Sequence, residues 1–467
     1  MEQRAKRSST IHELVHNFET SFSKGELPVS NEENLLNIIS YYEREKEVDK
    51  ALDVVNLAIE QFKYQVDFYL AKTRLLLKKN KIKEAQEILK NAESLAPGEV
   101  EISILNAIIF CEKYQYNAAL QLLGQISSDV PVAQQARIKL CVAYVFEHMK
   151  DYDKMFQVLQ ETLAIDPDNQ EALEKIWVSV ELSKKYEESI EFHQEFINNH
   201  PYAYLAWYNL GQAFSSIGEY EKAIDALEYS FLINEFFEMG YRDCADICMQ
   251  IQNHPKALQV LYDIISKFGV DEETLVSISE CHIQLNQYFQ AKKILIKAVK
   301  LDPYNDEIYY LLGQCFSKEE KWHYAINAYK RALDLEDRRE EFHAGLAEAY
   351  IKTNNLKAAQ SHLVEATRLA PDQYIYWAQL IKFFIDTHQL LKAHKAVNKA
   401  DHACGDTEII FIKGLCLYLD DQNKAAMDVL AEGLKDNYAA HAVLKLMYPT
   451  ILEDAEVKAM LRYYQQD

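Results

Sequence analysis

The chain has 467 residues, of which only 12 are glycine and 9 are proline, and about half are apolar. This composition is typical of a mainly helical globular chain. No stretch approaches 18 consecutive apolar residues, which excludes a transmembrane helix on length. The 72 acidic residues outnumber the 50 basic ones, for a formal net charge of −22. Such a surface repels the phosphate backbone of a nucleic acid.

The stretch from Tyr204 to Phe237 has the spacing of two amphipathic helices joined by a short turn at Gly218. Apolar or small residues recur at intervals of three and four in both halves, namely Trp207, Leu210, Gly211 and Phe214, and then Tyr220, Ala223, Ile224 and Leu227. This periodicity predicts a helical hairpin. A hairpin of this size cannot bury its own apolar stripe, so we expect similar hairpins on both sides.

The small residue that opens the second helix of this hairpin recurs about every 34 residues. The series runs Ala223, Ala257, Ala291, Ala325, Ala359 and Ala393, then Ala426 after a 33-residue step, and backward through Ser189, Met155 and, after a 36-residue step, Ala119, Ala85 and Ala51. The chain therefore contains about twelve similar units. Those with Ser189 and Met155 in place of alanine are expected to pack less regularly.

The pattern W-x2-L-G-x2-F followed by alanine resembles the tetratricopeptide repeat. One unit carries it as Trp207, Leu210, Gly211, Phe214 and Ala223, and another as Tyr309, Leu312, Gly313, Phe316 and Ala325. The resemblance implies an all-α fold, an α-solenoid whose hairpins form a right-handed superhelix. The expected organisation is a basic arm and capping helix in residues 1–31, twelve repeats in residues 32–437, and C-terminal capping helices in residues 438–467.

The segment before the first repeat has its own helical signature. Residues 1–8 form a basic arm that we expect to be disordered, and an apolar stripe follows at Ile11, Leu14, Val15, Phe18 and Phe22. Ser9 or Thr10 would begin this helix and Gly25 to Pro28 would end it. Because terminal repeats need a cap, the simplest role of the helix is to cover the first repeat. A mobile helix offered to a partner, or one folded into the groove, is the alternative.

The eight cysteines lack the spacing of a disulfide framework or of a paired Cys-x-x-Cys motif. Most of them lie among core residues of first helices, which predicts buried, reduced thiols. The start of the chain also lacks the apolar core of a secretion signal. These features predict a cytoplasmic protein.

One motif with catalytic spacing is present near the start of the chain. His12, Glu13 and His16 spell H-E-x-x-H, which on a helix places two imidazoles on one face for Zn²⁺. Only eleven residues precede it, and no strand-rich segment could position a substrate, so two solvated histidines on a capping helix are favoured over a zinc metalloprotease. No Gly-rich phosphate loop and no G-x-S-x-G motif occurs elsewhere. The sequence therefore predicts no enzyme, no metal and no cofactor.

In the tetratricopeptide family, the concave surface is lined by first-helix positions one and five residues after the Trp-like position. Carried over to the central repeats, these positions are Tyr208, Gln212, Arg242, Asp246, Val276, Glu280, Tyr310, Gln314, Ala344 and Glu348. The resemblance thus implies a polar and mildly acidic groove. Family members that clamp the C-terminal carboxylate of chaperones use Lys, Asn and Arg at such positions, and this chain offers no such set.

In repeats two to four the same flank of the first helices is largely apolar. It comprises Leu70, Arg74, Leu77, Ile104, Ile108, Cys111, Leu140 and Tyr144. These residues are either buried against adjacent helices or form an exposed apolar strip that receives an amphipathic helix. We place the partner-binding surface at this strip, with the N-terminal helix as the competing occupant.

Together these patterns predict a non-catalytic protein–protein interaction scaffold that binds a partner protein or peptide in the concave groove of a solenoid. No nucleic acid and no membrane is expected among its partners. An RNA-binding helical-repeat protein is the nearest alternative architecture, and the acidic charge disfavours it.

Overall fold

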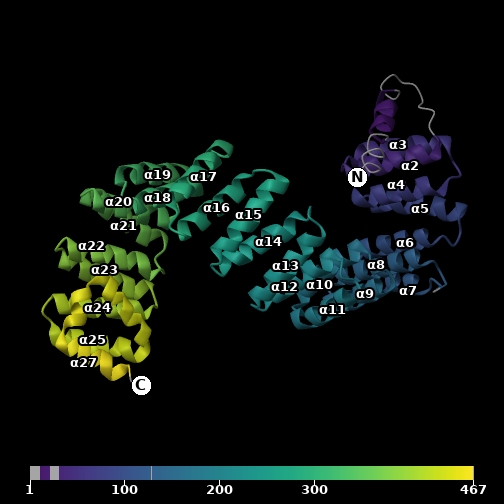
Figure 1. Ribbon diagram of the computed structural model, residues 1–467. Helices are drawn as coiled ribbons and strands as arrows, with labels where there is room; N and C mark the ends of the chain where they lie inside the picture. Colours follow the sequence, from purple (N-terminus) through teal and green to yellow (C-terminus); the bar gives the residue numbers. More distant parts are fainter. Residues whose placement is uncertain (1–10, 21–30, 128, 466–467) are drawn as a thin grey trace. The chain divides into compact units, whose positions relative to one another are not determined.

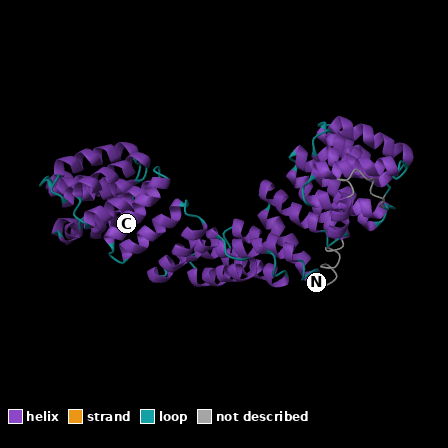
Figure 2. Ribbon diagram, turned by 90° about the horizontal axis from the view of Figure 1, so that it is seen from above, coloured by secondary structure: helices purple, strands orange, loops and turns teal. Residues whose placement is uncertain are grey.

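The computed structural model describes residues 11–20, 31–127 and 129–465. Throughout these residues the regular elements are helices and none is a strand, which confirms the all-α fold class (Figure 2). No helix within them is long and apolar enough to cross a membrane. The expected basic arm, the N-cap at Ser9 or Thr10 and the stop at Gly25 to Pro28 lie outside the described residues. The chain divides into two compact units, Met1–Gly240 and Tyr241–Asp467.

Unit 1 contains an N-terminal helical segment, residues 11–20, followed by six helical hairpins that stack in chain order (Figure 1). The hairpins are α2 (Glu32–Arg44) with α3 (Val48–Gln61), α4 (Val66–Lys78) with α5 (Ile82–Leu95), α6 (Val100–Glu112) with α7 (Tyr116–Gly124), α8 (Val132–Met149) with α9 (Tyr152–Ile165), α10 (Gln170–Ser183) with α11 (Tyr186–Asn199), and α12 (Tyr204–Ser216) with α13 (Tyr220–Ile233). The 36-residue step falls where α7 is short and α8 is long, so the extra residues lie in the connection and in a longer first helix.

Unit 2 repeats the arrangement and ends in a cap. Its hairpins are α14 (Glu238–Gln250) with α15 (His254–Phe268), α16 (Glu272–Gln284) with α17 (Tyr288–Leu301), α18 (Asp306–Lys318) with α19 (Trp322–Leu335), α20 (Glu340–Lys352) with α21 (Leu356–Leu369), α22 (Tyr374–Asp386) with α23 (Leu390–Ala403), and α24 (Thr407–Leu419) with α25 (Asn423–Asp436). The cap consists of η1 (Tyr438–His441), α26 (Ala442–Met447), η2 (Pro449–Glu453) and α27 (Ala455–Tyr464).

The small residues of the 34-residue series hold the hairpins together. All twelve, from Ala51 to Ala426 and including Ser189 and Met155, have 0% of their surface exposed. Their positions allow two helices to approach closely, as Gly211 illustrates. A Cβ atom at Gly211 would lie 2.7 Å from Leu227 Cγ and 3.1 Å from the Ala223 carbonyl oxygen. The solenoid of hairpins is thus confirmed, whereas the handedness of its superhelix stays a prediction.

One or two residues after the end of each first helix lies a residue with positive φ, five residues before the residue of the 34-residue series. These residues are Lys46, Asn80, Tyr114, Lys150, Lys184, Gly218, Gln252, Asn286, Glu320, Asn354, His388 and Asp421. At every one of these turns but that of Lys184, the next residue donates its backbone N–H to a carbonyl five residues back, as from Lys81 to Leu76 at 2.9 Å. This left-handed helix end satisfies carbonyls that the helix leaves unpaired. Glycine is favoured at such a position, and the chain supplies it only at Gly218.

The N-terminal helical segment packs on the first hairpin. Val15 and Phe18 are buried in one cluster with residues of α2 and α3, including Leu35 and Ile38. The hydroxyl of Tyr42 donates a hydrogen bond to Glu19 Oε1 at 2.9 Å. The segment therefore covers an apolar face of α2 that would otherwise be open, as a cap does.

The histidines of the H-E-x-x-H motif lie on the exposed face of this capping segment. His12 makes an edge contact with the Tyr41 ring, with centroids 5.4 Å apart, and His16 is exposed. In the residues that the structure describes, no three His, Cys, Asp or Glu side chains are grouped so that they could hold a metal ion.

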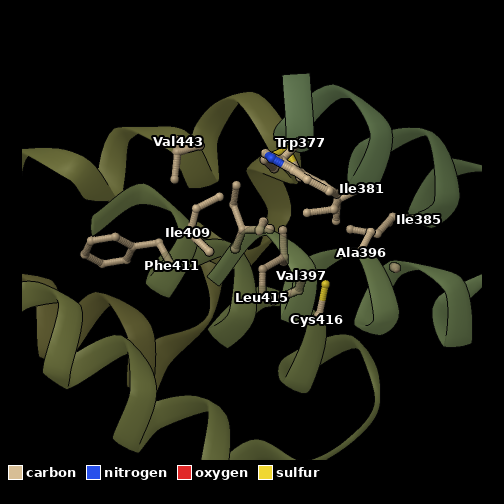
Figure 3. Packing of buried hydrophobic residues seen from close by; sticks show 14 of the residues in the cluster. Trp377, Ile381, Ile385, Ala396, Val397, Ile409, Phe411, Leu415, Cys416 and Val443 are labelled. Atoms are coloured by element: carbon tan, nitrogen blue, oxygen red, sulfur yellow. The ribbon is translucent and has the colours of Figure 1, made fainter. Parts of the chain in front are cut away.

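The C-terminal cap closes the last hairpin with apolar side chains. Val443, Met447, Ile451 and Val457 join a cluster that also contains residues of α22 to α24. Figure 3 shows Val443 of this cap together with residues such as Trp377, Val397 and Ile409. The Lys382 ammonium donates to the Met447 carbonyl oxygen at 2.9 Å, which ties α22 to the end of α26. The fading of the repeat signature after Tyr438 thus coincides with short helices that cover the final repeat.

Trp207 lies at the edge of its hairpin. Its ring is only partly buried and stacks on Tyr229 with centroids 4.6 Å apart. Its indole N–H donates to the Pro201 carbonyl oxygen at 2.9 Å, and Trp377 makes the same bond to Pro371. Trp207 therefore packs on the second helix of its hairpin and ties the first helix to the preceding loop.

All eight cysteines are buried and unbridged, as predicted.

Candidate functional site

The apolar strip of repeats two to four is part of the core of unit 1. Leu70 is 5% exposed, Ile104 6% and Leu140 9%. Ile108 is partly buried and packs against two successive core clusters. The hypothesis of an exposed strip is therefore wrong for these side chains. The first helices α4, α6 and α8 contact one another directly, so this flank lies in the seam between them.

Polar residues among the predicted groove positions of unit 1 are engaged in internal contacts. Arg74 pairs with Glu101 at 3.1 Å, and Arg137 pairs with the same buried carboxylate at 2.6 Å. The Tyr144 hydroxyl donates to Glu112 at 2.6 Å. These contacts join the first helices of successive repeats.

The remaining predicted position pair of unit 1 is also largely enclosed. Tyr208 is buried and meets the Phe237 ring edge-on, with centroids 5.0 Å apart. Gln212, one turn further along α12, is partly buried. The structure therefore does not bring the predicted positions of unit 1 together in an open groove.

In unit 2 some of the predicted positions do meet. Two adjoining pockets of about 540 and 320 Å³ lie along α16, α18, α20 and α22, and we name them together the unit 2 groove. The residues that line it are Met249, His254, Glu280, Cys281, Ile283, Gln284, Asn286, Tyr288, Glu307, Tyr310, Leu311, Gln314, Ser317, Lys318, Tyr329, Glu341, Ala344, Gly345, Glu348, Ile375, Tyr376 and Gln379. Four of the predicted positions, Glu280, Tyr310, Gln314 and Glu348, thus line one surface, and their role in binding a partner stays a prediction.

Three further predicted positions of unit 2, Val276 among them, lie outside the groove. Arg242 pairs with Asp271 at 3.2 Å and with Glu273 at 3.7 Å, which connects α14 to the start of α16. Asp246 is exposed on α14 and lines neither pocket.

The floor of the groove is a tyrosine held between two glycines. Tyr329 of α19 is buried, and its hydroxyl lies 3.3 Å from Ser317 Oγ. A Cβ atom at Gly313 would lie 2.5 Å from the Tyr329 ring, and one at Gly345 would lie 2.8 Å from it. The ring therefore fits between α18 and α20 only because neither glycine has a side chain.

Tyr310 connects the two pockets and lies among aromatic rings. Its ring centroid is 4.9 Å from that of Phe342 and 5.9 Å from that of Tyr329. Burial raises the pKa of the Tyr310 phenol above its ordinary value. Burial, with Glu340 and Glu341 nearby, also raises the pKa of Tyr376 to about 12. Both tyrosines are therefore neutral hydrogen-bonding groups at physiological pH.

The electrostatic character of the groove is acidic. Its lining includes four carboxylates, Glu280, Glu307, Glu341 and Glu348, and one lysine, Lys318. The guanidinium of Arg339 pairs with both Glu307 and Glu341 at 2.5 Å. Within the described chain, Glu280 and Glu348 have no ion-pair partner.

Burial raises the pKa of the Glu280 carboxyl, and the nearby Glu307 contributes to the rise. The ionised form of Glu280 is thus poorly compensated by its own surroundings.

Comparisons with known proteins agree with this architecture. Models of the tetratricopeptide repeat match residues 204–235, 272–305 and 317–382, and the model of the tetratricopeptide repeat protein 21 ARM repeat matches residues 64–162. The chain therefore contains tetratricopeptide repeats in these segments.

Individual relatives of this repeat chain are distant. The CTR9 homolog of Arabidopsis thaliana is 23% identical over 310 residues, which cover 56% of this chain and 28% of that protein. This chain therefore spans less than a third of that relative's length. The solved structure of the Cut9–Hcn1 hetero-tetramer of the APC/C has a TM-score of 0.36 at 13% identity, over 93% of this chain and 96% of that one. The structure of YrrB, described as a repeat protein with an unusual peptide-binding site, has a TM-score of 0.33 at 15% identity, over 39% of this chain and 95% of that one.

Several groove residues were missed by the sequence analysis. Tyr329 belongs to a second helix, whereas the family positions carried over lie on first helices. Gly345 could have indicated Tyr329, because a glycine beside the small residue of a first helix leaves room for a bulky side chain of the neighbouring helix. Glu341 lies one turn before Ala344, and Tyr376 lies on α22, where no position was carried over. Their place in the groove depends on how neighbouring repeats are offset.

Proposed function

We propose that this chain is a non-catalytic scaffold that binds a segment of a partner polypeptide in the unit 2 groove. The tetratricopeptide-repeat architecture supports a protein-interaction role in general. The observation that carries the specific proposal is the convergence of Tyr310, Gln314, Glu280 and Glu348 on two adjoining pockets. Concave sites that combine aromatic faces with a few polar groups are the usual form of binding sites.

The composition of the groove supports a polypeptide ligand. The amides of Gln284, Gln314 and Gln379 offer both donors and acceptors, which suits the backbone of a peptide. Tyrosine rings supply large contact areas at low conformational cost. The eight unbridged thiols support a reducing compartment, so we place this activity in the cytoplasm.

The experiment is capture of partners by the full chain, compared with a variant whose groove is filled. Ala344 lines the larger pocket and is partly exposed, so Ala344→Trp would occupy the pocket without entering the core. Ala425→Trp, an exposed position on α25, is the matched control. Affinity purification with mass spectrometry should find proteins that are lost with Ala344→Trp and kept with Ala425→Trp. Equal recovery with both variants would contradict the proposal.

A further inference from the structure

We infer that the unit 2 groove selects a basic side chain, and that the lysine or arginine of the bound polypeptide segment pairs with Glu280 beside Tyr310. This inference rests on the proposed function and names the chemistry of the partner. It follows from three features of the groove, namely an uncompensated carboxylate, adjacent aromatic faces and an excess of negative charge.

Glu280 of α16 is the carboxylate that would receive the basic side chain. It lines the smaller pocket and is partly buried, yet no Lys, Arg or His in the described residues forms an ion pair with it. Placing a carboxylate in a partly desolvated site without a partner is unfavourable. A cationic side chain that enters the pocket would remove this penalty and form a charge-assisted hydrogen bond.

His254 in the same pocket is incompletely satisfied as well. Its Nδ1 atom is buried and has no hydrogen-bond partner. The smaller pocket thus has two polar groups whose interactions are incomplete within the chain itself.

The tyrosine rings of the groove also favour a basic side chain. Tyr310 lines both pockets, and Tyr376 lines the larger one. Cations are attracted to the faces of tyrosine rings, and the aliphatic part of a lysine or arginine side chain packs well against them. A basic residue therefore satisfies the carboxylate and the rings together, whereas an acidic residue would satisfy neither.

The negative charge around the groove disfavours the binding of an acidic side chain. Arg339 is shared among Asp306, Glu307 and Glu341, so these three carboxylates keep a net negative charge. Lys318 is the one basic residue with an exposed side chain in the lining. Like charges at close range disfavour binding, so an acidic peptide would be repelled from this part of the groove.

The inference is tested with a phage-displayed library of random 12-residue peptides, selected on the full chain. Enriched peptides should carry Lys or Arg at one position. One such peptide, made with its basic residue and with methionine in its place, is then titrated by fluorescence anisotropy into the wild type and into Glu280→Gln. Because hydrogen bonds to charged groups contribute about 1.5–3 kcal/mol, each single change should weaken binding roughly ten- to a hundredfold.

The two changes should be coupled. Once the peptide has methionine, Glu280→Gln should have little further effect, as a double-mutant cycle requires for a direct contact. Glu432→Gln makes the same change at an exposed position on α25 and should leave affinity unchanged. Glu280→Lys should instead enrich peptides with Asp or Glu at the same position. Circular dichroism melting checks that each variant is folded.

Two results would overturn the inference in distinguishable ways. If peptides bind, and Ala344→Trp prevents their binding, but no basic preference or coupling is found, the groove binds polypeptides and the assignment to Glu280 is wrong. If selection on the wild-type chain enriches no peptide more strongly than selection on Ala344→Trp does, both this inference and the proposed function fail.

Discussion

His193 makes unit 1 sensitive to acid. The side chain is 0% exposed in α11, and its Nδ1–H donates to the Ser189 carbonyl oxygen at 2.8 Å. Its Nε2 atom lies 3.4 Å from the Asn209 amide nitrogen, which also donates to the Leu173 carbonyl oxygen at 2.8 Å. The neutral ring thus satisfies both neighbours, whereas a second ring proton would face the amide donor of Asn209.

Protonation of His193 in the folded state is unfavourable. Burial lowers the pKa of His193 from 6.5 to about 4, and the hydrogen bond to Ser189 opposes this only in part. Because the folded pKa is below the unfolded one, the contribution to stability is complete above pH 6.5 and is lost as the pH falls towards 4. Linkage gives a loss of about 2.5 kcal/mol between pH 7 and 4.5.

The assay is urea unfolding at pH 7 and 4.5 of the wild type, His193→Gln and His16→Gln. Glutamine keeps one donor and one acceptor but does not titrate in this range, and His16 is an exposed control in the same unit. The carboxylates of the chain make the same contribution, in all three proteins, to the change in unfolding free energy between the two pH values. Between pH 7 and 4.5, the free energy of unfolding should therefore fall by about 2.5 kcal/mol more in the wild type and in His16→Gln than in His193→Gln. Equal losses in all three would refute the reasoning.

Three further predictions concern packing and turns, each measured by circular dichroism during thermal or urea unfolding. Gly218 has φ of 82° and no atom near an added Cβ, so Gly218→Ala should cost about 1 kcal/mol through backbone strain alone; Gly124→Ala, equally uncrowded, should not, and equal costs would contradict this. Gly313→Ala should cost about 1–3 kcal/mol by displacing Tyr329, and a double variant with Tyr329→Leu should recover part of it; no recovery would place the clash elsewhere. Ile108→Asp should destabilise unit 1 by about 2 kcal/mol or more because it puts a carboxylate into the seam between first helices; an unchanged melting profile would restore the exposed strip.

The fold was largely predictable because one constraint repeats. A helix pair needs a small residue where its axes cross, so Ala223 and its counterparts mark every hairpin at a fixed period. The left-handed turns were predictable only at Gly218. Asn80, Asn286 and Asn354 carry a weaker signal of the same kind, because asparagine also tolerates positive φ. Lysine, glutamate, tyrosine or histidine at other turns carries none, because tertiary packing imposes the conformation there.

The groove was predictable in part, for a related reason. Tyr310, Gln314, Glu280 and Glu348 could be placed by counting along first helices. Their equivalents in unit 1, such as Leu70 and Ile104, are buried because apolar first helices pack side by side there. Whether a flank position is open or buried depends on the side chains of the next repeat, and counting along one helix does not contain that information.

The central claim is that the first helices of unit 2 bind a partner polypeptide, and hydrogen exchange of the full chain with and without a selected peptide tests it most directly. Bound peptide should slow exchange in segments that cover α18 and α20, which supply Tyr310, Gln314, Ala344 and Glu348, and Ala344→Trp should abolish this protection. Protection confined to second helices such as α21 and α23, or protection that persists in Ala344→Trp, would contradict the account.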